Sequence, residues 1–167
     1  NSSSFGNNAK ATGLSSTAIG TGSQAQAGLS TSVGAGANAE AQNSTSLGGN
    51  SAAIGTFAAA LGVNANASGD EATALGSKST ASGSVSVAVG VSSIASGNSS
   101  TALGHASNAV GERTVAIGQG ADALAQFSMA LGVNATAGTN SVGQGAIAIG
   151  YEADATLNQT TAVGYLS

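Results

Sequence analysis

The chain has 167 residues, a formal net charge of −4, and only 6% charged and 3% aromatic residues. It contains no cysteine, which excludes disulfides and thiolate metal sites. Its three basic residues, Lys10, Lys78 and Arg113, are scattered, so we expect no nucleic-acid partner. No apolar run approaches the roughly 20 residues of a membrane-spanning helix, so we expect no direct membrane insertion by this segment.

A glycine that follows a large apolar residue recurs along the whole chain. It first appears at Gly6, and steps of 14 residues lead from there to Gly132. The next step, to Gly150, is 18 residues, and the last, to Gly164, is again 14. The four additional residues predict a small insertion near 138–145. A period that covers the chain predicts one repeat domain over residues 1–167.

We number the positions of each repeat from its large apolar residue, which is position 0. Position +6 is always Ala, +4 is Ala or Ser, and −2 is small or β-branched in most repeats. These even offsets are typical of strands, in which alternate side chains share a face. We therefore expect position 0 to form the structural core. Its row consists of Ile19, Val33, Leu47, Leu61, Leu75, Val89, Leu103, Ile117, Leu131, Ile149 and Val163.

Fourteen residues accommodate two short strands joined by two corners. Glycine suits a corner because it tolerates positive φ and close backbone approach. The sequence therefore predicts an all-β fold, a parallel β-roll (β-solenoid) of about twelve 14-residue coils. At about 4.8 Å for each strand step, such a rod is about 55–60 Å long.

Position −1 is also constrained, because it is Ala or Ser in every repeat. Its odd offset predicts that it faces away from position 0, and a face exposed to water would accept larger residues. We interpret it as a candidate subunit-packing row against further copies of the chain, with tight packing inside one subunit as the alternative. Which face is interior and which is interface stays open at this point. The row consists of Ala18, Ser32, Ser46, Ala60, Ala74, Ala88, Ala102, Ala116 and Ala130.

Positions +3, +5 and +7 vary freely and are mostly polar, as in Gln24, Gln26 and Glu40. This variation predicts an outer sheet that faces water. Any ligand is expected to meet the chain there, although the sequence does not indicate which residues bind it.

The segments "STAIGTGSQAQA" (16–27), "ATALGSKSTASG" (72–83) and "STALGHASNAVG" (100–111) resemble the YadA-like head repeat of trimeric autotransporter adhesins. The resemblance covers nearly the whole chain. It implies a left-handed parallel β-roll that assembles as a homotrimer on the surface of a Gram-negative bacterium. It also implies attachment to host cells or to extracellular-matrix proteins such as collagen. We expect an excised head, because the family's stalk and its C-terminal outer-membrane anchor are absent from this chain.

No arrangement of residues predicts an enzyme, a cofactor site or a metal site. His105 is the only histidine and has no evident partner, so a surface position is favoured. Asp70, Glu71, Glu152 and Asp154 do not form the Gly-Gly-x-Gly-x-Asp repeat of calcium-binding rolls. Two alternatives to adhesion remain: a passive spacer in a surface fibre, and an ice-binding solenoid. The second is disfavoured because the threonine row at position −2 is interrupted, for example at Val87.

Overall fold

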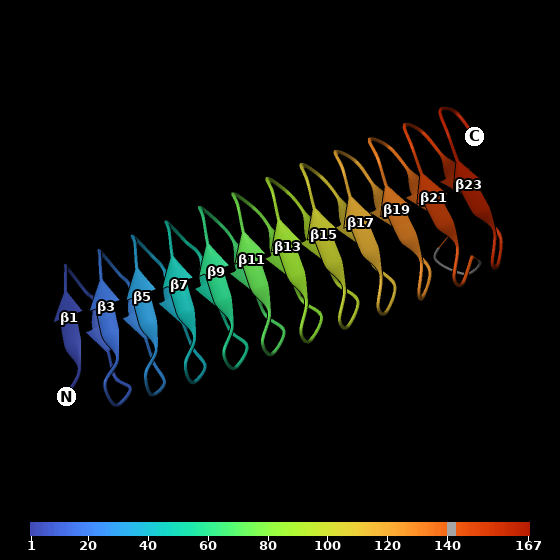
Figure 1. Ribbon diagram of the computed structural model, residues 1–167. Coiled ribbons are helices and arrows are strands. Elements are labelled where there is room, and N and C mark those ends of the chain that lie inside the picture. Colours follow the sequence, from blue (N-terminus) through green and yellow to red (C-terminus); the bar gives the residue numbers. More distant parts are fainter. Residues whose placement is uncertain (140–142) are drawn as a thin grey trace.

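The computed structural model describes residues 1–139 and 143–167, which form one stack of coils with the two termini at opposite ends (Figure 1). Each coil contributes one strand to each of two parallel sheets. The 12-stranded sheet contains β1 (Ser3–Phe5), β3 (Thr17–Ile19), β5 (Thr31–Val33), β7 (Thr45–Leu47), β9 (Ala59–Leu61), β11 (Thr73–Leu75), β13 (Val87–Val89), β15 (Thr101–Leu103), β17 (Val115–Ile117), β19 (Met129–Leu131), β21 (Ile147–Ile149) and β23 (Thr161–Val163). The 11-stranded sheet contains β2 (Lys10–Ala11), β4 (Gln24–Ala25), β6 (Asn38–Ala39), β8 (Ala52–Ala53), β10 (Asn66–Ala67), β12 (Thr80–Ala81), β14 (Ile94–Ala95), β16 (Asn108–Ala109), β18 (Asp122–Ala123), β20 (Thr136–Ala137) and β22 (Asp154–Ala155).

The repeat register is maintained along both sheets. Every strand pairs in parallel with the strand one coil away, so that Ile19 pairs with Val33 and Ala25 with Ala39. The predicted all-β parallel solenoid is thereby confirmed, with about eleven turns, and no residue of the described part is helical.

The glycine after position 0 opens the first corner of each coil, where the chain leaves the 12-stranded sheet. Gly76 has φ 134°, and a Cβ on it would lie 2.5 Å from the carbonyl oxygen of Gly90 in the next coil. Stacked coils therefore leave no room for a side chain here, which explains why glycine recurs at this position.

Serine hydroxyls close many of the corners. Ser107, at position +4, donates its hydroxyl to the carbonyl oxygen of Gly104 across the first corner at 3.0 Å. Ser30, at position −3, does the same to Ala27 across the second corner at 2.7 Å. These bonds satisfy hydroxyl groups that are buried inside the roll, where an unpaired hydroxyl destabilises the fold.

The interior between the sheets holds only small side chains. Positions −3 and −1 of one sheet face positions +4 and +6 of the other, and all four rows consist of Ala, Ser or Thr. Among residues 1–139 and 143–167, the largest fully buried side chain is that of Thr114. Two sheets with such short side chains lie close together, and an Ile or Leu does not fit between them.

This interior corrects the predicted roles of two rows. Ala18, Ala88 and the other members of the −1 row are fully buried inside their own coil, so they are not available to pack against another subunit. Position 0, predicted as the core, lies on the outer side of the 12-stranded sheet, where Leu75 is 44% exposed. The prediction that position 0 forms the core was wrong, because it assumed that the side-chain alternation of a strand continues through the glycine corner. The turn at positions +1 to +3 interrupts that alternation, so the interior side changes from odd to even offsets.

The insertion is shorter than the predicted range 138–145. Gly145 donates its backbone N–H to Gln126, as the equivalent residue does in regular coils, and Gly138 likewise bonds to Ala155. Both residues therefore keep repeat positions, and β19 and β21 pair across a step of 18 residues. The four additional residues are 139–142, of which 140–142 lie outside the described residues.

Candidate functional surface

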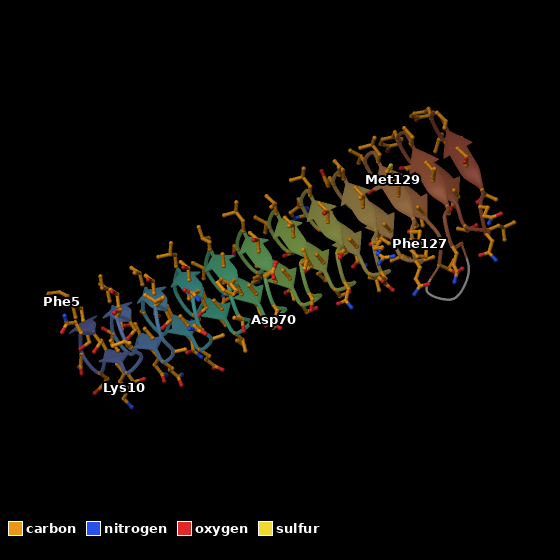
Figure 2. The ribbon with its side chains drawn as sticks, turned by 60° about the horizontal axis from the view of Figure 1, so that its bottom comes forward. Phe5, Lys10, Asp70, Phe127 and Met129 are labelled. Carbon is orange, nitrogen blue, oxygen red and sulfur yellow. The ribbon has the colours of Figure 1, made fainter. Side chains whose placement is uncertain are left out.

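The outer side of the 12-stranded sheet carries one large apolar side chain in every coil, beside a serine, a threonine or a second apolar residue. We call it the aliphatic face and define it by positions −2 and 0, from Ser3 and Phe5 to Thr161 and Val163. Figure 2 shows two of its side chains, Phe5 and Met129, near opposite ends of the rod and directed away from it. Three basic and seven acidic residues make ten charged residues in the chain, and none of them lies on this face. An uncharged apolar strip of this length is unusual for a surface that contacts only water.

The outer side of the 11-stranded sheet has a different chemistry. We call it the polar face, defined by positions +5 and +7. Its first coils carry an amide ladder, in which Gln26 donates to Gln24 at 3.4 Å and to Asn38 at 3.2 Å. Further along, burial raises the pKa of the Asp122 carboxyl, although a hydrogen bond from Asn108 partly opposes this effect. The predicted water-facing sheet is confirmed at these two positions, which are at least partly exposed in all coils but one.

The second corner joins the polar face back to the aliphatic face. Position −4 lies at its tip, and non-glycine residues there adopt left-handed backbone conformations, including Phe57 at φ 58° and Val85 at φ 56°. Leu29, Phe57, Val85 and Phe127 are all more than half exposed at this corner. Figure 2 labels Phe127 near the C-terminal end of the rod. Bulky apolar residues are uncommon in this conformation and in water, and the sequence analysis missed the row.

Two aromatic side chains at the first corner contact each other. Tyr151 and Tyr165 occupy position +2 of successive coils, and their rings stack with centroids 5.2 Å apart. A hydrogen bond to Glu152 and its negative charge raise the pKa of Tyr151. His105 holds the same position in an earlier coil and is exposed, as expected.

A shallow depression lies on the second corner beside the insertion. Gly111 and Ala125 form part of its lining together with Val110, Leu124 and three polar side chains. The polar lining residues are Glu112, Gln126 and Gln144. It contains no arrangement of groups that suggests catalysis.

The described residues contain no group of three or more His, Cys, Asp or Glu side chains that suits a metal ion. No helix long and apolar enough to cross a membrane occurs in residues 1–139 and 143–167.

The comparison with protein families decides the identity of the repeat. The model described as "YadA head domain repeat (2 copies)" matches residues 1–23, 25–51, 53–79, 67–93, 81–107, 95–121 and 141–167. The chain belongs to the YadA head family. No match was found among curated proteins.

Membership of the YadA head family confirms the resemblance seen in the sequence. YadA heads are cell-surface adhesin domains of autotransporters and are not known as an enzyme family. The repeat motif itself could be read from the sequence. The side of the sheet on which its aliphatic residues lie became visible only in the fold.

Proposed function

We propose that this chain is the head of a trimeric surface adhesin, in which three copies lie side by side with their aliphatic faces together. The observation that carries the proposal is the aliphatic face itself: an apolar, uncharged strip on one side of a YadA head that spans all twelve strands of its sheet.

The spacing of the aliphatic face favours a second copy of the chain as its partner. Each coil presents one large apolar side chain, such as Leu61, Leu75 or Val89, about 4.8 Å from the next. A partner that contacts every coil equivalently needs the same spacing, and another copy of the roll has it. Burial of these side chains also strengthens a fold whose own interior holds nothing larger than threonine.

We propose that the surfaces that remain exposed when the copies join through their aliphatic faces bind the host. The polar face, with its amide ladder at Gln24, Gln26 and Asn38, carries hydrogen-bonding side chains in most coils. The coil of Ala52 and Ile54 is an exception. Three parallel copies of a weakly binding surface give multivalent attachment to host-cell or extracellular-matrix proteins without a deep pocket. We also propose that the head is displayed at the bacterial surface by an outer-membrane anchor outside this chain.

Two measurements test the proposal. Sedimentation equilibrium should give three times the 15.4 kDa mass of one chain, and a single-chain mass at all concentrations would contradict the association. Binding of the assembled head to immobilised matrix proteins and to host cells should exceed that of the dissociated chain.

The alternative is a passive spacer within a surface fibre. A spacer also assembles, but it binds none of the host surfaces. Assembly without adhesion would therefore favour the spacer and leave the association intact.

A further inference from the structure

We propose that the apolar side chains at the tip of the second corner belong to the contact between copies and set the axial register of that contact. The residues concerned are Leu29, Phe57 and Val85, which occupy position −4 in alternate coils. This inference rests on the proposed side-by-side association and adds a surface and a function to it.

The corner row repeats over two coils, whereas the fold repeats over one. From residue 15 to residue 99, position −4 alternates between polar and apolar residues. In chain order they are Ser15, Leu29, Asn43, Phe57, Glu71, Val85 and Ser99. All seven have φ between 55° and 59°, so the backbone at this position does not require the alternation.

The aliphatic face shows the same two-coil alternation at position −2. Thr45, Thr73 and Thr101 alternate there with Ala59 and Val87. In these five coils a polar corner residue always precedes threonine, and an apolar corner residue always precedes alanine or valine. The two flanking coils are exceptions, because Thr31 follows apolar Leu29 and Val115 follows charged Arg113.

Agreement between the two rows indicates a common partner. Position −4 lies two residues before position −2, at the margin of the aliphatic face, with only the buried position −3 between them. A corner that contacts only water has no reason to follow the pattern of the sheet beside it. Exposed Phe57 and Val85 in left-handed conformations are also unfavourable in a free chain, and contact with a neighbouring copy offsets part of that cost.

A two-coil alternation prevents neighbouring chains from slipping along each other, which a one-coil repeat would allow. Identical coils allow neighbouring chains to slip by one step, about 4.8 Å, with the loss of only the terminal contacts. When apolar bands alternate with polar bands, a slip of one coil places Phe57 of one copy at the level of Glu71 of the next. Such a mismatch disfavours the slipped register.

The test exchanges the two kinds of corner residue without changing composition or charge. One variant carries the six substitutions Leu29→Asn, Asn43→Leu, Phe57→Glu, Glu71→Phe, Val85→Ser and Ser99→Val. It is coexpressed with the wild-type chain under a different affinity tag, and mixed assemblies are isolated through both tags. The control variant exchanges Thr80→Ile with Ile94→Thr on the polar face.

We expect the control variant to mix with the wild-type chain in the proportions of chance, and the corner variant to form several-fold fewer mixed assemblies. A corner variant that stays folded by circular dichroism but does not assemble also supports the contact. Free mixing of the corner variant overturns the inference while the association stands. A wild-type chain that sediments as a single copy overturns both.

If the six-fold variant does not fold, the pair Phe57→Glu and Glu71→Phe replaces it. The same reduction in mixed assemblies is expected on a smaller scale, and free mixing of this pair overturns the inference.

Discussion

The two sheets of the roll share one interior and differ in their outer faces. Both present alanine and serine inward, and both pair strands in the same parallel register. Outward, one sheet carries Leu75 and Leu103, whereas the other carries Thr80 and Asn108. In this fold the smallest residues form the core, and the large apolar residues lie outside it, where we propose that they join copies of the chain.

The largest expected loss of stability comes from a charge placed in the interior that the two sheets share. Ala88 is fully buried, so Ala88→Lys leaves an unpaired charge between the sheets. We expect it to cost at least about 3–5 kcal/mol and to abolish the β-sheet signal in circular dichroism. Thr80→Lys, on the polar face, is the control and should fold normally. A folded Ala88→Lys chain that only fails to assemble would restore the original interpretation of this row as an interface.

The glycine corners come next in expected effect. Gly76→Ala places a Cβ against the carbonyl oxygen of Gly90 and should destabilise the fold by about 3 kcal/mol. Gly22→Asn is the control, because no atom lies within 4 Å of a Cβ there and Asn8 and Asn50 hold the equivalent position. Urea unfolding measures both variants, and equal loss in the two would contradict the stacking argument.

How much of this fold the sequence predicts depends on the part considered. The 14-residue period, the two strands and the glycine corner follow from spacing alone, because each coil repeats the same local requirements. The side on which Ile19 or Ala18 lies does not follow, because a turn of three residues resets the alternation. The absence of any residue larger than threonine at positions −3, −1, +4 and +6 was the available signal. The corner row of Phe57 and Val85 was visible only after the fold brought it beside the aliphatic face.

Loss of a corner hydroxyl should have a moderate effect. Ser107→Ala removes the hydrogen bond to the carbonyl oxygen of Gly104, and we expect a loss of about 1 kcal/mol in the free energy of unfolding. Alanine already occupies this position in other coils, for example at Ala121, so the fold itself should persist. Ser82→Ala, at an exposed site, should change stability less, and the opposite order would contradict the proposed function of the hydroxyl.

The smallest expected effect is a change in the pH dependence of stability, caused by Asp122 on the polar face. Because burial raises the pKa of Asp122 in the folded chain, its ionised form lowers stability at neutral pH. This penalty disappears as the pH falls through the raised value toward the ordinary carboxyl pKa of about 3.9. Asp122→Asn should therefore stabilise the chain slightly at neutral pH and not in acid. Urea unfolding midpoints of the wild type and of Asp122→Asn, measured at neutral pH and in acid, check this prediction. Asp154→Asn is the control. A gain that is independent of pH would exclude ionisation as its cause.

The most direct test of the account is the mass of two double variants in sedimentation equilibrium. One carries Leu75→Lys and Leu103→Lys on the aliphatic face, and the other carries Thr80→Lys and Asn108→Lys on the polar face. Both should retain the β-sheet signal, because all four side chains point out of the roll. We predict that the first sediments as a single 15.4 kDa chain and that the second keeps the trimer mass proposed for the wild type. An aliphatic-face variant with unchanged mass would contradict the claim that this face joins the copies.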